Sequence, residues 1–266
     1  MTHSVIFKRL LVWGTPVLGF VAWEEWLRWE RAVWEVLIIL TWLEATAVWY
    51  LTKRSVGVSS TQKRLHHNEY WRFLISPLTF VWMTSGYIMI LENWWWQQII
   101  IVGATVCGWL VLANIADRFT RSASYPPQSF ETLSTNLNAV TIFFAATVAY
   151  SWIALLNTSV WVMALALLVV LTALTYQTLW IAGLSLARAW LAIIVIDLLF
   201  VELFWVLLWL PNTYYVKALL LLVGTYITIN VCRNQLLGIL TPTMVRRYLL
   251  IATVIVGLVV LTAQWG

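Results

Sequence analysis

The fold is decided by residues 189–210, which read AWLAIIVIDLLFVELFWVLLWL. Apart from two acids, Asp197 and Glu202, every side chain in this stretch is apolar. A helix needs about 20 predominantly apolar residues to cross the hydrocarbon core of a bilayer. The stretch therefore predicts a membrane-spanning helix that carries two carboxyl groups.

The composition of the whole chain agrees with that prediction. Of the 266 residues, 62% are apolar and 10% are charged, and the mean hydropathy is +0.85. A soluble globular protein is roughly half apolar and about a quarter charged, so the composition excludes a soluble enzyme. The chain also contains 20 tryptophans, and indole side chains concentrate at membrane–water interfaces.

Applied along the whole chain, the same length criterion gives nine candidate spans and an all-α bundle. The first span is the weakest, because it is short and contains Gly14, Pro16 and Gly19. A secretory signal peptide is the rival interpretation, but the small-residue cleavage site that it needs is missing. If the first segment lies at the interface instead, eight spans remain. The candidates are residues 6–23, 33–51, 71–91, 98–116, 137–156, 160–183, 189–210, 214–232 and 247–265.

The positions of Lys and Arg predict how the chain is oriented. Only Arg28, Arg31 and Lys217 fall on one side of the predicted spans, and all the other cations fall on the opposite side. Cytoplasmic loops are rich in Lys and Arg, so a nine-span chain has its N-terminus inside and its C-terminus outside. Six inner cations are expected to anchor anionic lipid headgroups: Lys53, Arg54, Lys63, Arg64, Arg246 and Arg247.

The predicted loops are too short to form a soluble domain, so we expect residues 1–266 to form a single transmembrane domain. Cys107 and Cys232 both lie in apolar runs, and no Cys and His spacing resembles a metal site. The sequence contains neither a phosphate-binding glycine loop nor a catalytic motif. We therefore do not expect an enzyme, a cofactor, a metal or a nucleic acid partner.

Three carboxyl groups, those of Glu44, Asp197 and Glu202, lie deep inside the predicted spans. An acid at the centre of a membrane-spanning helix costs about 2.5–3.5 kcal/mol on insertion scales. A hydrogen-bond partner, a bound proton or a water-filled cavity must offset that cost. A group that carries protons and a structural hydrogen bond between helices are both open explanations.

Spacing along the helices predicts partners for two of these acids. Thr41 lies three residues before Glu44, on the same helical face. Asp197 has only apolar neighbours on its own face, so its partner must come from another helix, for which we expect residues 160–183. The candidates at a comparable depth are Thr172, Thr175, Tyr176 and Gln177.

Glu202 is expected to pair with Lys217 across a tight turn at residues 211–213. The lysine lies on the next, antiparallel span and about one helical turn shallower, an offset that its long side chain covers. The alternative is that Lys217 extends to the interface without binding an acid.

Residues 23–35 combine acids, arginines and tryptophans. We expect a helix that lies at the outer interface, with its charges toward water and its indole rings toward lipid. Glu24 and Arg28 are spaced for an ion pair. A platform that binds sugars or peptides is the alternative. Tryptophans expected at the same outer level are Trp94, Trp95, Trp96, Trp161, Trp205, Trp209 and Trp265.

On the inner side, His66, His67 and Glu69 stand among several cations. A lipid transferase could use such a set, and Asp117, which we expect to pair with Arg121, could join it. Adjacent histidines point in different directions on a helix, so a basic anchor at anionic headgroups is the commoner explanation.

Three classes of function remain open. We rank a transporter or proton-coupled channel first, because deep acids cost more than a passive role requires. The alternatives are a non-catalytic membrane scaffold or assembly factor, with other membrane proteins as partners, and a membrane-embedded transferase acting on lipids or lipid-linked substrates. A polar cavity at Glu44 or Asp197 favours transport, whereas acids sealed by neighbouring side chains favour a scaffold. The short loops fit the cytoplasmic membrane of a prokaryote.

Overall fold

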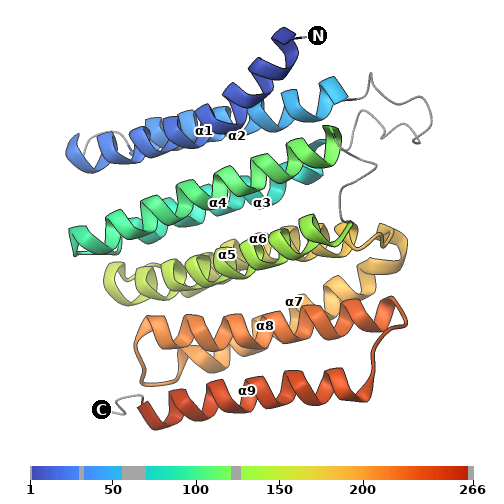
Figure 1. The fold of residues 1–266 in the computed structure, drawn as a ribbon. Coiled ribbons are helices and arrows are strands. Elements are labelled where there is room, and N and C mark those ends of the chain that lie inside the picture. Colours follow the sequence, from blue (N-terminus) through green and yellow to red (C-terminus); the bar gives the residue numbers. More distant parts are fainter. Residues whose placement is uncertain (1, 30–32, 56–69, 121–126, 263–266) are drawn as a thin grey trace. The chain divides into compact units, whose positions relative to one another are not determined.

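A computed structural model of the chain describes residues 2–29, 33–55, 70–120 and 127–262. These residues form nine α-helices and no strand (Figure 1). Each of the nine candidate spans coincides with one helix, so the all-α prediction is confirmed. The helices are α1 (Thr2–Trp29), α2 (Val33–Ser55), α3 (Tyr70–Ile88), α4 (Trp94–Thr120), α5 (Pro127–Leu156), α6 (Val160–Ile181), α7 (Leu186–Leu208), α8 (Tyr214–Leu236) and α9 (Pro242–Thr262).

Five of the helices contain segments that are long and apolar enough to cross a membrane. The stretch that carries Asp197 and Glu202 is among them. Helices of this length and hydropathy identify an integral membrane protein. The five segments are Trp94–Asp117, Glu131–Leu156, Val160–Ile181, Leu186–Leu208 and Tyr214–Leu236.

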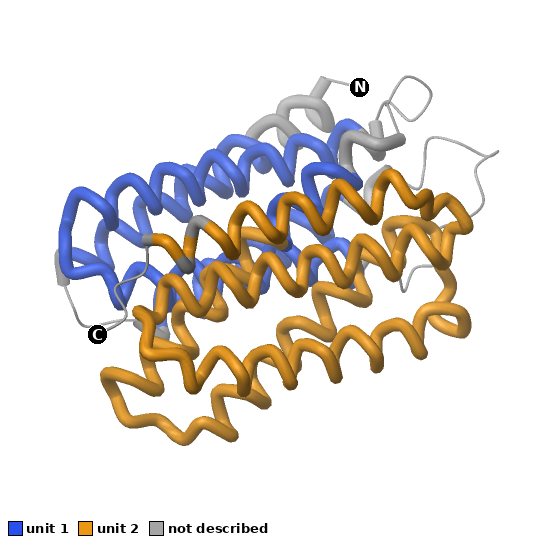
Figure 2. Tube along the Cα trace, turned by 90° about the horizontal axis from the view of Figure 1, so that it is seen from below, with its two compact units in different colours: residues 1–138 blue, residues 139–266 orange. Residues whose placement is uncertain are grey.

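The chain divides into two compact units, residues 1–138 and residues 139–266, with the division inside α5 (Figure 2). In unit 1, α1 packs on α2 and α4, and α3 packs on α2 and α4. The α1 face that enters this bundle carries Val12, Thr15, Gly19, Trp23 and Trp26. Their spacing of three and four residues is that of one helical face.

The segment that was expected to lie at the interface is part of α1, which continues to Trp29. Trp23 is only 3% exposed, and its Nε1–H donates to Ser85 Oγ on α3 at 3.0 Å. Trp26 is also buried. The expectation that these two rings face lipid is therefore wrong, because the helix does not break before them and their positions fall on its packed face. The side chain of Arg28 lies outside the described residues.

Exposed tryptophans occur both inside helices, such as Trp42 in α2, and at helix ends. Trp94, Trp95 and Trp96 begin α4, Trp161 lies in the first turn of α6, and Trp209 follows α7; all are exposed. Trp205 of α7, which is expected at the same outer level, is half-buried, and the level of these rings in a bilayer stays a prediction. Trp265 lies outside the described residues.

In unit 2, α7 packs on α6 and α8, and α8 packs on α9. Two turns in this unit depend on glycine, since Gly183 follows α6 with φ +83 and Gly238 follows α8 with φ +69. After each glycine, the next N–H bonds to the carbonyl five residues earlier, Leu184 to Leu179 at 3.1 Å and Ile239 to Asn234 at 3.0 Å. This helix ending needs a left-handed residue, which favours glycine. The helices therefore follow one another through short, defined turns.

Candidate functional site: buried carboxyl groups

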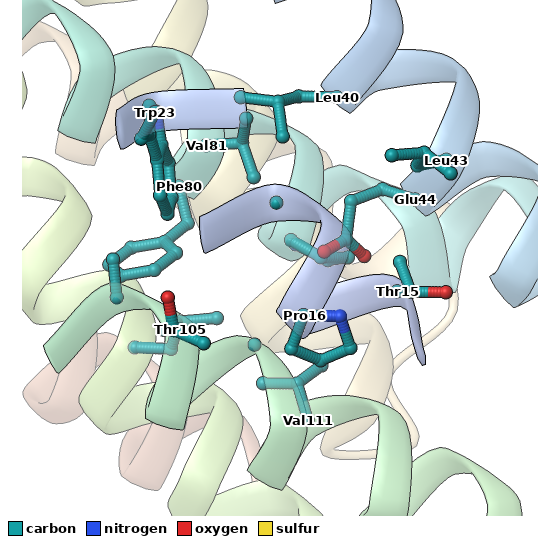
Figure 3. A pocket seen from close by; sticks show the side chains of 15 residues that line it. Thr15, Pro16, Trp23, Leu40, Leu43, Glu44, Phe80, Val81, Thr105 and Val111 are labelled. Atoms are coloured by element: carbon teal, nitrogen blue, oxygen red, sulfur yellow. The ribbon is translucent and has the colours of Figure 1, made fainter. Parts of the chain in front are cut away.

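Glu44 lies in the interior of unit 1, on the packed face of α2. Leu37, Leu40, Val48 and Leu51 are buried on the same face. Because a helix repeats every three to four residues, this face places the Glu44 side chain among apolar ones. Glu44 as a residue is 7% exposed. Figure 3 shows it pointing into a small cavity.

The cavity is formed by α1 to α4 and by Leu137 of α5, all within unit 1. Thr15 and Thr105 supply hydroxyl groups to its wall, and most of the other lining side chains are apolar. About 20 Å³ is open to the centre of a water molecule. A single water needs roughly 10–15 Å³ measured in this way. The cavity therefore has room for about one water beside the acid.

The polar contacts of Glu44 are few. No described residue forms a hydrogen bond with Oε2, although this atom is buried. Gly108 of α4 lies on the other side, where an added Cβ would be 3.7 Å from Oε1. The Thr105 hydroxyl donates to the Ile101 carbonyl at 2.8 Å. The carboxyl group thus lies among mostly apolar side chains and a glycine, and none of the described residues that line its cavity is a cation.

Two of the helices that line this cavity contain a proline, Pro16 in α1 and Pro77 in α3, and each helix continues through it. Proline lacks the N–H that the helical ladder uses, and its ring clashes with the preceding turn. Pro16 weakened the prediction of the first span, and its position beside Glu44 could not be read from the sequence.

The prediction that Thr41 is the hydrogen-bond partner of Glu44 is wrong. The Thr41 hydroxyl donates to the Leu37 carbonyl at 2.7 Å and accepts the Nε1–H of Trp82 at 3.0 Å. A threonine hydroxyl has one hydrogen. Because that hydrogen goes to the carbonyl one turn earlier, Thr41 gives no donor to the acid.

Asp197 lies at the middle of α7, and its partner comes from α6, as expected. Thr172 Oγ1 is 2.8 Å from Asp197 Oδ2. Oδ1 is buried and has no hydrogen-bond partner among the described residues. Of the four side chains expected at this depth, Thr172 is the one that meets the acid.

The other polar residues of α6 are buried in different ways. Gln177 is 0% exposed, and neither of its amide atoms has a hydrogen-bond partner among the described residues. Tyr176 is half-buried and packs against a small apolar cluster that includes Leu179 and Ile193. Tyr176 and Gln177 follow Thr172 by about one helical turn on α6 and add uncharged polar groups to the interior of unit 2.

The expected ion pair between Glu202 and Lys217 does not form. The Lys217 ammonium donates to the Leu208 carbonyl at 3.2 Å, at the end of α7. The last carbonyls of a helix have no partner within it and carry partial negative charge, so they attract the lysine. Glu202 is exposed and lines a groove between α7 and α8, with Thr225 and Thr228 on the facing helix.

The basic anchors are described only in part. Arg246 and Arg247 are exposed near the beginning of α9, and their binding to lipid headgroups stays a prediction. The side chains of the other anchors, the histidine segment and the arginines near Asp117 lie outside the described residues: Lys53, Arg54, Lys63, Arg64, His66, His67, Glu69, Arg118 and Arg121.

The fold and the carboxyl groups together define a class, an integral membrane helical protein with acids held inside each of its two units. A family model described as a protein of unknown function (DUF5656) matches residues 15–262. The chain belongs to this family. No curated protein and no solved structure matches the chain.

Proposed function

We propose that the protein is a multi-pass protein of a prokaryotic cytoplasmic membrane that binds and releases a proton at Glu44, as a proton-coupled transporter or proton channel. The observation that carries this proposal is the buried Glu44 carboxyl, with an unpartnered oxygen, in a cavity that has room for about one water. A buried acid without a cation beside it favours its neutral, protonated form.

The size of the cavity supports a proton rather than a solute as the bound species. Pockets for small molecules usually enclose about 300–1,000 Å³, far more than the ≈ 20 Å³ open beside Glu44. A single water in this cavity would carry the proton to the acid, and Thr15 and Thr105 are the threonines among the lining residues. Pro16 and Pro77 each remove one N–H from the helical hydrogen-bond ladder, and the cavity is proposed to open at these weakened points.

The orientation proposed with this function has nine spans, the N-terminus inside and the C-terminus outside. It follows from the distribution of Lys and Arg between the two sides. The lipid bilayer, including its anionic headgroups, is the proposed partner of the inner cations.

Proton flux through reconstituted protein tests the role of Glu44. Vesicles that contain the full chain and an enclosed pH-sensitive dye are given a pH gradient, with a potassium ionophore to balance charge. We expect Glu44→Gln to slow the decay of the gradient about a hundredfold, the lower end of what a positioned proton-transfer group contributes. Glu44→Asp keeps a carboxyl group and is expected to retain part of the flux.

Glu92→Gln is the matched control, because Glu92 is exposed in the turn between α3 and α4 and removing its charge leaves the cavity intact. We expect this variant to conduct like the unchanged protein. The proposal is wrong if the pH gradient decays at the same rate in vesicles with Glu44→Gln, in vesicles with the unchanged protein and in protein-free vesicles.

A membrane scaffold is the second candidate, and the groove at Glu202 favours it. An exposed carboxyl lies there among Ile196, Leu199 and Val206, and about 340 Å³ of the groove is open to the centre of a water molecule. No described residue forms an ion pair with Glu202, since Lys217 binds a carbonyl. A partner helix with one Lys or Arg at the matching depth supplies the missing charge.

This candidate is tested with two synthetic leucine-rich helices, one with a central Arg and one with Gln at the same position. Energy transfer between labelled helix and labelled protein in vesicles measures their association. We expect the Arg helix to bind the unchanged protein and to bind Glu202→Gln at least several times more weakly. Equal transfer with both helices would exclude a charged partner in this groove.

A further inference from the structure

Asp197 stands at a depth where an unpaired charge is least stable. It is the central residue of α7 (Leu186–Leu208), so each end of the helix is roughly 16 Å away at 1.5 Å per residue. The acid is flanked on its own helix by apolar residues, and α6 carries no charged side chain. Its protonation state is therefore decided by the few polar atoms that surround it.

Hydrogen atoms can be counted at this site. Thr172 Oγ1 lies 2.8 Å from Asp197 Oδ2 and 2.8 Å from the Leu168 carbonyl oxygen. The hydroxyl has one hydrogen and two oxygens within reach. A helical threonine commonly donates to the carbonyl four residues earlier. With that donation made, the contact to Oδ2 needs a hydrogen from the acid.

A neutral acid satisfies both contacts at once. Its Oδ2–H donates to Thr172 Oγ1, and the threonine O–H donates to the Leu168 carbonyl. Oδ1 then remains as a carbonyl oxygen, which agrees with its burial without a hydrogen-bond partner among the described residues. Asp197 is part-buried, and an ionised side chain would have one hydrogen bond from the described residues for both oxygens, which leaves the charge on buried Oδ1 without a donor at a cost in free energy.

No cation in the described part of unit 2 lies near the depth of Asp197. Each is within a few residues of a helix end, and Lys217 is bound to the Leu208 carbonyl. The other titratable side chains on the helices that approach α7 at intermediate depth are tyrosines. The cations are Arg188, Lys217, Arg233, Arg246 and Arg247, and the tyrosines are Tyr150 on α5, Tyr176 on α6 and Tyr226 on α8.

We propose that Asp197 is a neutral carboxylic acid that donates to Thr172, and that it forms a second proton-binding site inside unit 2. The proposal does not rest on Glu44, which lies in unit 1. The bound ligand is a proton, and the Thr172 hydroxyl is the positioning group that accepts from the protonated oxygen.

Isotope-edited infrared spectroscopy tests this proposal in the unchanged protein, because the chain contains two aspartates, Asp117 and Asp197. Full-length protein with ¹³C in the aspartate carboxyl groups is placed in phosphatidylcholine and phosphatidylglycerol vesicles near neutral pH. We expect the label to shift one carboxylic acid band, from Asp197, and one carboxylate band, from exposed Asp117. Both aspartates in the carboxylate form would overturn the proposal.

Substitutions then assign the band and its partner. We expect Asp197→Asn to remove the acid band and Asp117→Asn to leave it. Thr172→Val removes the acceptor and is expected to move the acid band to higher frequency, whereas Thr172→Ser keeps its position. An acid band unmoved by Thr172→Val would overturn the assigned hydrogen bond. Because glutamate is unlabelled, none of these outcomes depends on Glu44.

Discussion

At the scale of single residues, partners decide what each buried polar group does. Trp23 and Ser85 illustrate this point, because the indole N–H has a partner 3.0 Å away and both side chains are buried. Ser85 Oγ also donates to the Val81 carbonyl at 2.9 Å. The serine therefore joins α1 to α3 through one hydroxyl.

Ser85→Ala is expected to lower the free energy of unfolding by about 0.6–1.7 kcal/mol, the range measured for hydrogen bonds between membrane helices. The substitution leaves the Trp23 N–H buried without an acceptor. Titration of the protein from mild detergent into dodecyl sulfate measures the change. The control is Ser85→Ala made in protein that already carries Trp23→Phe. The prediction fails if Ser85→Ala lowers the free energy of unfolding as much in that variant as in the unchanged protein.

Some contacts of single residues could be predicted from the sequence and others could not. The depth of Glu44 and Asp197 follows from their position in apolar runs, and Thr172 could be named as a partner because it lies opposite Asp197 on the next helix. The Lys217 contact could not, because the carbonyls at the end of α7 compete with Glu202 for the ammonium. Backbone acceptors have no signature in a sequence.

At the scale of elements, apolar run length predicted every helix in the described chain, since a run of about 20 residues has few other solutions in a membrane. Helix ends were less predictable. Polar residues extend α1 to Trp29 and α5 back to Pro127, beyond the apolar runs. The Glu44 cavity was missed because it depends on which faces of four helices meet, and Thr105 and Gly108 are ordinary residues of an apolar span.

At the scale of the whole molecule, the proposed orientation gives opposite exposure to the turns at Glu92 and Thr241. Single cysteines at these positions, in a chain whose Cys107 and Cys232 are replaced by serine, report it through a membrane-impermeant maleimide. We expect Glu92→Cys to react in intact cells and Thr241→Cys to react only after the membrane is opened. The positive-inside distribution is the reason for this order. If both variants react in intact cells, or Thr241→Cys alone reacts, the proposed orientation is wrong.

The narrowness of the space beside Glu44 also has a consequence for ionic selectivity. A divalent cation such as Mg²⁺ needs about six oxygen ligands in a fixed geometry. The wall of the ≈ 20 Å³ cavity offers the carboxyl group and the hydroxyls of Thr15 and Thr105, of which Thr105 is already bonded to a backbone carbonyl. A metal ion that entered this cavity would give up its water ligands and find too few protein oxygens to replace them. A proton needs one oxygen, so we expect the site proposed at Glu44 to take up protons and not metal cations.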